Sequence, residues 1–217
     1  SSEYMALLGL AEISMRKRAL HAAIPHLQRA IRAQARRVEA PFQLAQVYRM
    51  LRRDDDARAM LEKIVEQFPT YTPACMAYAD LLMTDAPPSP QHALEQYEAV
   101  LTVDPTLLRA QAGAAASRLR LGLFADAIRD FKMLLKSKPR DPHLTFLLGT
   151  ALHWQQSYAE AVTAYKTAIN SLPAASPLIP VRLWNLRLAY LAQHGAYPGN
   201  LEPRYRIASL PAAAKAP

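Results

Sequence analysis

A pattern of small and bulky residues recurs along this chain with a period of about 34 residues. In the cleanest copy, Ala161 is followed by Tyr165, Ala168 and Pro173. Shifting back by one period at a time gives four further copies: Ala127, Phe131, Leu134 and Pro139; Ala93, Tyr97, Val100 and Pro105; Ala57, Leu61, Ile64 and Pro69; and Ala23, Leu27 and Ala30. A fixed period of this length is typical of a solenoid, in which each repeat contacts only its neighbours.

The residue types within the period favour pairs of α-helices. Ala or Gly lets two backbones approach closely where helices cross, a bulky side chain fills the space beside them, and Pro cannot continue a helix. Hydrophobic residues make up 51% of the 217 residues, while six Gly and 17 Pro suit helices with stops more than strands and hairpins. We therefore predict an all-α protein.

This pattern resembles the tetratricopeptide repeat, a helix-turn-helix unit with small residues at the helix contact and Pro after the second helix. The resemblance implies a right-handed superhelical α-solenoid of about five units plus a C-terminal capping helix. We place this solenoid at residues 1–194, with repeats at 4–37, 38–71, 72–107, 108–141 and 142–175 and the capping helix at 178–194. A Pro- and Ala-rich C-terminal tail occupies residues 195–217.

The capping helix is predicted from Val181, Trp184, Leu188 and Leu191, which recur at the three- and four-residue spacing of a helix. Gly195 is expected to end this helix. In the tail, five apolar residues are expected to hold the segment against the repeats or against a partner: Tyr197, Leu201, Tyr205, Ile207 and Leu210.

Local signals give further expectations. Ser157 and Glu160 have the spacing of a capping box. The third repeat is two residues longer than the others, in a turn where Ser89 can cap the next helix and Pro90 can begin it. This turn is either a specificity loop or a tolerated surface insertion. The single cysteine, Cys75, falls at a helix-packing position and is expected to be a small buried residue.

The resemblance also implies a binding surface, because the first helix of each repeat lines a concave groove in this family. Carried over position by position, the predicted groove residues are Met5, Leu8, Met15, Arg16, Phe42, Arg49, Met50, Met76, Met83, Arg109, Leu119, Arg120, Phe146, His153 and Trp154. Five of the seven Met residues fall in this set, and Met is typical of adaptable binding surfaces. The alternative is that these Met residues pack between helices. The four Arg residues of the set would bind an acidic or carbonyl-rich segment.

The positive charge is concentrated at the start of the chain. Of the net charge of +8, the residues through 53 carry +7. We define a basic patch as Lys17, Arg18, Arg29, Arg32 and Arg36, and expect the last three to share one helix face. The patch either binds an acidic protein, nucleic acid or lipid, or solubilises the protein. No aromatic residues interleave with these cations, which disfavours nucleic acid.

Catalytic chemistry finds no support in the sequence. The six His residues form no pair with a helical zinc-site spacing, and the chain has no Gly-rich phosphate loop, no G-x-S-x-G and no second Cys. We therefore expect no enzyme activity, catalytic residue, metal or cofactor. No stretch reaches the length and apolarity of a membrane span, so we expect a soluble protein of the cytoplasm or periplasm.

Our functional hypothesis is a non-catalytic scaffold or adaptor that binds a helical or extended segment of a protein partner in the groove. We expect it to act within a bacterial assembly or secretion complex, since the Ala- and Arg-rich composition suggests a bacterial source. One alternative is an anion-surface binder that acts through the basic patch. Another is a self-associating module of a larger protein, which would form a homo-oligomer.

Overall fold

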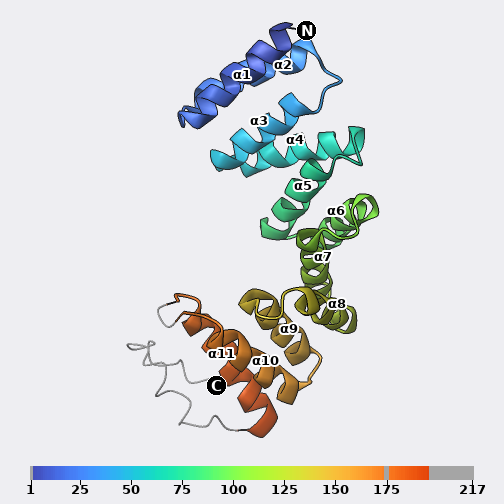
Figure 1. Ribbon diagram of the computed structural model, residues 1–217, viewed down its shortest axis with the longest axis vertical. Helices are drawn as coiled ribbons and strands as arrows, with labels where there is room; N and C mark the ends of the chain where they lie inside the picture. The colour runs from blue at the N-terminus through green and yellow to red at the C-terminus, as the bar shows by residue number, and fades with distance from the viewer. Residues whose placement is uncertain (1, 174–175, 196–217) are drawn as a thin grey trace. The chain divides into compact units, whose positions relative to one another are not determined.

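A computed structural model of the protein describes residues 2–173 and 176–195, and these residues form α-helices and no strand (Figure 1). The helices within this part of the chain are α1 (Ser2–Arg16), α2 (Leu20–Ala33), α3 (Glu39–Met50), α4 (Asp54–Gln67), α5 (Thr72–Thr84), α6 (Pro90–Val103), α7 (Leu108–Arg120), α8 (Phe124–Ser137), α9 (Pro142–Trp154), α10 (Tyr158–Asn170) and α11 (Ile179–His194). The predicted all-α fold is confirmed.

The repeated Ala residues lie in every second helix, from α2 to α10, and all five are fully buried: Ala23, Ala57, Ala93, Ala127 and Ala161. The bulky residue four positions later is also buried in each copy. Pro69, Pro105 and Pro139 each follow the end of one of these helices by two residues. The period therefore marks the side of the second helix that packs inward.

The helices form two compact units, divided between Ser117 and Arg118. In the first unit, α1 packs on α2, α2 on α3, α3 on α4, α4 on α5, and α5 on α6. In the second unit, α8 packs on α9, α9 on α10, and α10 on α11. Each unit has its own apolar core, because helices that follow one another in the sequence cover each other's apolar faces.

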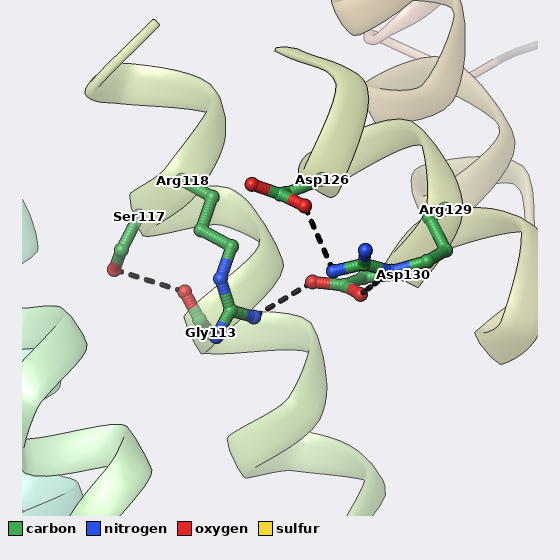
Figure 2. A network of polar contacts seen from close by, with 6 residues as sticks. All are labelled: Gly113, Ser117, Arg118, Asp126, Arg129 and Asp130. Atoms are coloured by element: carbon green, nitrogen blue, oxygen red, sulfur yellow. Dashed lines mark hydrogen bonds and ion pairs between the residues drawn. The ribbon is translucent and has the colours of Figure 1, made fainter. Parts of the chain in front are cut away.

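Polar contacts lie on either side of this division (Figure 2). In the first unit, the Ser117 hydroxyl donates to the Gly113 carbonyl at 3.0 Å. In the second unit, Arg118 donates to Asp130 at 2.7 Å, and Arg129 forms ion pairs with Asp126 at 2.9 Å and Asp130 at 3.5 Å. Arg118 and Asp130 are both partly buried, so their ion pair is less screened than a surface pair.

Tight turns between paired helices share one backbone conformation. Arg18, Arg52, Gly122 and Gln156 each have a positive φ, between 57° and 78°, in turns that connect α1 to α2, α3 to α4, α7 to α8, and α9 to α10. Only one of the four is a Gly, although left-handed backbone favours Gly. The longer turn of the third repeat spans residues 85–89. Pro90 begins α6 as expected, whereas the Ser89 side chain makes no capping hydrogen bond.

Two local predictions are wrong. Ser157 precedes α10, but its side chain makes no capping hydrogen bond, so the capping box with Glu160 does not form. Arg36 does not share a helix face with Arg29 and Arg32, because α2 ends at Ala33. The backbone of Gln34 has left the helical conformation before Arg36 is reached.

The residues whose spacing predicts the capping helix are not the ones that pack it against the repeats. In α11 the buried residues are Ile179, Arg182, Leu183, Leu186 and Ala189. Trp184, Leu188 and Leu191 are exposed instead. Both sets recur at helical spacing, so spacing alone could not decide which one faces the repeats. The Val181 side chain and the tail residues from 196 onward lie outside the described residues.

Arg182 is the charged group that fixes α11 against α9. Its guanidinium is almost fully buried, donates to the Pro142 carbonyl at 2.9 Å and lies 5.0 Å from the centre of the Phe146 ring. Burial lowers the pKa of Arg182, and the nearby Asp141 carboxylate opposes that shift.

Candidate functional site

A cleft of about 920 Å³ opens in the first unit, where the end of α3, the start of α4 and the end of α5 meet. We call it the α3–α5 cleft. Its lining residues are Gln46, Arg49, Met50, Arg52, Asp54, Asp55, Arg58, Leu81, Thr84, Asp85 and Ala86. A volume of this size is within the range of protein ligand sites.

An ion pair lies in the cleft lining. Arg58 of α4 and Asp85 of the long turn approach to 2.5 Å, and the Asp85 side chain is only 5% exposed. Burial raises the pKa of Asp85, the Arg58 charge opposes that rise, and the carboxylates of Asp54 and Asp55 add to it. Arg58 and Asp85 therefore largely neutralise one another, which leaves the other charged groups of the lining to meet a ligand.

Two cations of the lining make no ion pair with any described residue: Arg49, in the last turn of α3, and Arg52, in the turn that follows. Met50 lies between them in the sequence and is 54% exposed. Asp54 and Asp55 stand in the first turn of α4, where carboxylates suit the positive end of the helix dipole. The cleft thus presents free guanidinium groups beside apolar surface, with carboxylates at the start of α4.

The local backbone explains this arrangement. The left-handed conformation of Arg52 reverses the chain tightly between α3 and α4, so the last turn of one helix and the first turn of the next reach the same cleft. The long turn after α5 contributes Asp85 and Ala86. The two-residue excess of the third repeat therefore lies beside this cleft.

Of the predicted groove set, the cleft brings together Arg49 and Met50, and two further first-helix groove positions, Gln46 and Thr84, also line it. Five of the other residues are exposed: Met5, Arg16, Arg109, Arg120 and Trp154. Seven more are half-buried: Leu8, Met15, Phe42, Met83, Leu119, Phe146 and His153. Met76 of α5 is only 7% exposed, which favours the packing alternative for this residue. Sequence reasoning placed Arg52, Arg58 and the long turn outside the set, because none occupies a first-helix groove position.

Two of the other predicted groove cations are engaged by neighbouring carboxylates. Arg16 pairs with Glu12 at 2.7 Å. Arg109 pairs with Asp80, which also accepts a hydrogen bond from the Tyr97 hydroxyl at 2.7 Å. A ligand carboxylate would have to compete with these partners, whereas at Arg49 it would not.

In the second unit, the predicted residues on α9 belong to an aromatic cluster. His153 lies edge-on to Trp154 at 6.1 Å and to Tyr158 at 5.4 Å, and Trp154 stacks on Phe124 at 6.5 Å. The His153 Nδ1 atom is buried without a hydrogen-bond partner, and burial lowers the pKa of this imidazole. A neutral, packed His153 is more consistent with structural packing than with catalysis.

All five members of the basic patch are exposed: Lys17, Arg18, Arg29, Arg32 and Arg36. Arg29 makes a long ion pair with Glu3 at 3.5 Å, between two well-exposed side chains. Such a surface pair contributes little to stability, so it leaves the patch strongly positive.

The described residues contain no cluster of His, Cys, Asp and Glu able to hold a metal ion. Across residues 2–173 and 176–195, none of the helices has the length and apolarity needed to span a membrane. Cys75 is buried as expected, and its thiol donates to the Pro69 carbonyl at 3.3 Å.

Paired helices stacked at a fixed sequence period define a helical-repeat protein. Two models of the tetratricopeptide repeat family match the sequence, one over residues 14–82 and the other over residues 112–177. Together they cover more than half of the chain, and the chain belongs to the tetratricopeptide repeat family. Proteins of this family generally act as non-catalytic protein-interaction modules.

Solved structures of tetratricopeptide repeat proteins share the fold. A crystal structure of MamA is 19% identical, with a TM-score of 0.69 over 78% of this chain and 91% of MamA. YrrB, described as having an unusual peptide-binding site, is 14% identical, with a TM-score of 0.73 over 83% of this chain and 91% of YrrB. A repeat protein from Parabacteroides merdae is 18% identical, with a TM-score of 0.63 over 93% of this chain and 81% of that protein. No curated protein matches the sequence.

Proposed function

We propose that this chain is a non-catalytic scaffold that holds a segment of a partner protein in the α3–α5 cleft. The observation that carries the proposal is that one cleft is lined both by two cations without an ion-pair partner, Arg49 and Arg52, and by the exposed Met50. Family membership supports a protein as the ligand. The structure of YrrB is described as having an unusual peptide-binding site, which supports a peptide segment as the ligand.

The chemistry of the cleft indicates what the segment should carry. An apolar side chain would pack on the exposed Met50, while a neighbouring carboxylate would form charge-assisted hydrogen bonds with Arg49 or Arg52. A basic residue of the segment would face Asp54 and Asp55. A helical or an extended segment can meet these requirements. We infer that the scaffold serves a bacterial assembly or secretion complex; the Ala- and Arg-rich composition supports the bacterial source.

Selection from a random-peptide display library tests this proposal, followed by fluorescence anisotropy with the selected peptides. We expect the R49E/M50S variant to lose binding by about tenfold or more, because it removes a charged hydrogen bond and an apolar contact. The matched control is K63E/M133S, in which Met133 is 59% exposed and both residues lie outside the cleft lining. If peptides bind R49E/M50S as tightly as the control, the cleft is not the binding site.

The basic patch carries a second candidate function. Its five cations are exposed, and only Arg29 pairs with a described carboxylate. We propose binding to an anionic surface, for which retention on acidic vesicles or nucleic acid should fall steeply as ionic strength rises. An absence of retention at low salt would exclude this function.

A further inference from the structure

Helix α11 carries apolar residues on two opposite sides. One side is buried against the repeats through Ile179, Leu183, Leu186 and Ala189. The other side carries Trp184, Leu188 and Leu191, which are 50%, 39% and 45% exposed. We call these three residues the outer face of α11.

The outer face has the features of a helix-packing surface. Its residues follow at i, i+4 and i+7, the spacing of one stripe along a helix. The charged residues of α11 do not interrupt it, because Arg182 is on the buried side and Arg187 lies beside the stripe by helical position. Nothing in the described part of the chain covers this side of α11, and an exposed stripe of large apolar side chains indicates an interaction surface.

We propose that residues 196–217 of the same chain pack on the outer face of α11. This segment carries Tyr197, Leu201, Tyr205, Ile207 and Leu210, which supply enough apolar side chains to cover three residues. It follows Gly195, whose φ of +67° forms the left-handed end of α11. Such a helix end turns the chain out of the helix axis, so the next residues can run back along the helix.

The geometry of the chain permits this path. From Gly195 back to Trp184 is a distance of about 16 Å along the helix axis. Five or six extended residues span that distance, at about 3.3 Å per residue, and the segment has several times that number. Because the segment is covalently attached, its effective concentration at the outer face is in the millimolar range. A second copy of the protein at lower concentration would compete poorly.

Trp184 provides a direct probe, since the chain contains two Trp residues and the other is Trp154. In a W154F background, acrylamide quenching of Trp184 is measured for the full chain and for the chain ending at residue 195. A third protein keeps the full length and carries L201S, Y205S and L210S. The matched control is W184F, in which Trp154 reports on α9. Far-ultraviolet circular dichroism checks that each protein is folded.

We expect Trp184 to be shielded in the full chain, and its quenching constant to rise about twofold both on deletion and in the triple-Ser protein, since quenching follows the accessible ring area. The constant for Trp154 should not change. Equal quenching of Trp184 with and without the segment would overturn the proposal. Shielding that disappears on dilution would also overturn it and would identify a second copy as the occupant.

Discussion

Gly149 in α9 is predicted to be intolerant of even one added methyl group. A Cβ at this position would lie 2.8 and 2.9 Å from two carbons of the Tyr165 ring and 3.3 Å from the Ala164 Cβ. Tyr165 cannot easily move away, because it is 1% exposed, its ring lies 5.4 Å from Phe146 and its hydroxyl donates to the Thr150 hydroxyl. This is the close helix approach that the small residues of the repeat predict.

Two opposing contributions set the change in the free energy of unfolding caused by Gly149→Ala. Overpacking a well-packed core costs about 1–3 kcal/mol, while replacing Gly by Ala inside a helix stabilises by about 0.5–1 kcal/mol. We therefore expect Gly149→Ala to lower the free energy of unfolding by about 1 kcal/mol, within a range of about 0–2.5 kcal/mol. Gly9 in α1 is the matched control, because a Cβ there would meet no atom within 4 Å. Gly9→Ala should raise the free energy of unfolding by about 0.5–1 kcal/mol.

Urea unfolding can follow each unit separately. Trp154 and Trp184 both lie in the second unit, so their fluorescence reports on Gly149→Ala. The single cysteine, Cys75, lies buried in the first unit, so the reactivity of its thiol reports on Gly9→Ala. If Gly149→Ala stabilises the second unit as Gly9→Ala stabilises the first, the close approach of α9 and α10 is refuted.

Four further predictions concern single residues. Phe131→Ala should lower the free energy of unfolding by about 3–5 kcal/mol in urea titrations, because Phe131 is fully buried, and a negligible loss would contradict its core position. Gln156→Gly should raise the melting temperature, since it relieves about 1 kcal/mol of left-handed backbone strain, and an unchanged or lower value would contradict that strain. Burial lowers the pKa of His153, so its contribution to stability is complete above the unfolded pKa of about 6.5 and is lost as the pH falls through the folded value. Urea titrations between pH 7.5 and 5 should show this loss, and His153→Gln should reduce it. Burial raises the pKa of the Cys75 thiol, so a thiol reagent should modify the native protein far more slowly than the unfolded protein; equal rates would place Cys75 at the surface.

The repeat period predicted the fold because it is set by packing, which the sequence encodes directly. Ala57 and Leu61, for example, are fully buried, as a helix contact at a fixed spacing requires. Spacing does not decide which side of α11 is buried, because two apolar stripes recur along it and only one packs on α10 and α9. Met76 shows that a repeat position does not by itself predict a groove residue, because this position lines the groove in the family but its side chain is buried in this protein.

The α3–α5 cleft was only partly predictable for a different reason. Arg49 and Met50 follow from repeat positions. Arg52 reaches the cleft through a left-handed backbone conformation, which the sequence does not predict because the residue is not a Gly. Asp85 comes from the longer turn of the third repeat, where it forms an ion pair with Arg58 of α4. Sequence periodicity carries no information on either contact.

Methyl NMR of the protein with labelled Met side chains tests binding in the α3–α5 cleft most directly. A peptide selected by display is titrated into the protein, and the methyl signals of Met50 and Met133 are compared. Both side chains are exposed, but only Met50 lines the cleft. We predict that the Met50 signal shifts in proportion to the bound fraction while the Met133 signal stays unchanged. A bound peptide that leaves Met50 unshifted would contradict the proposed site.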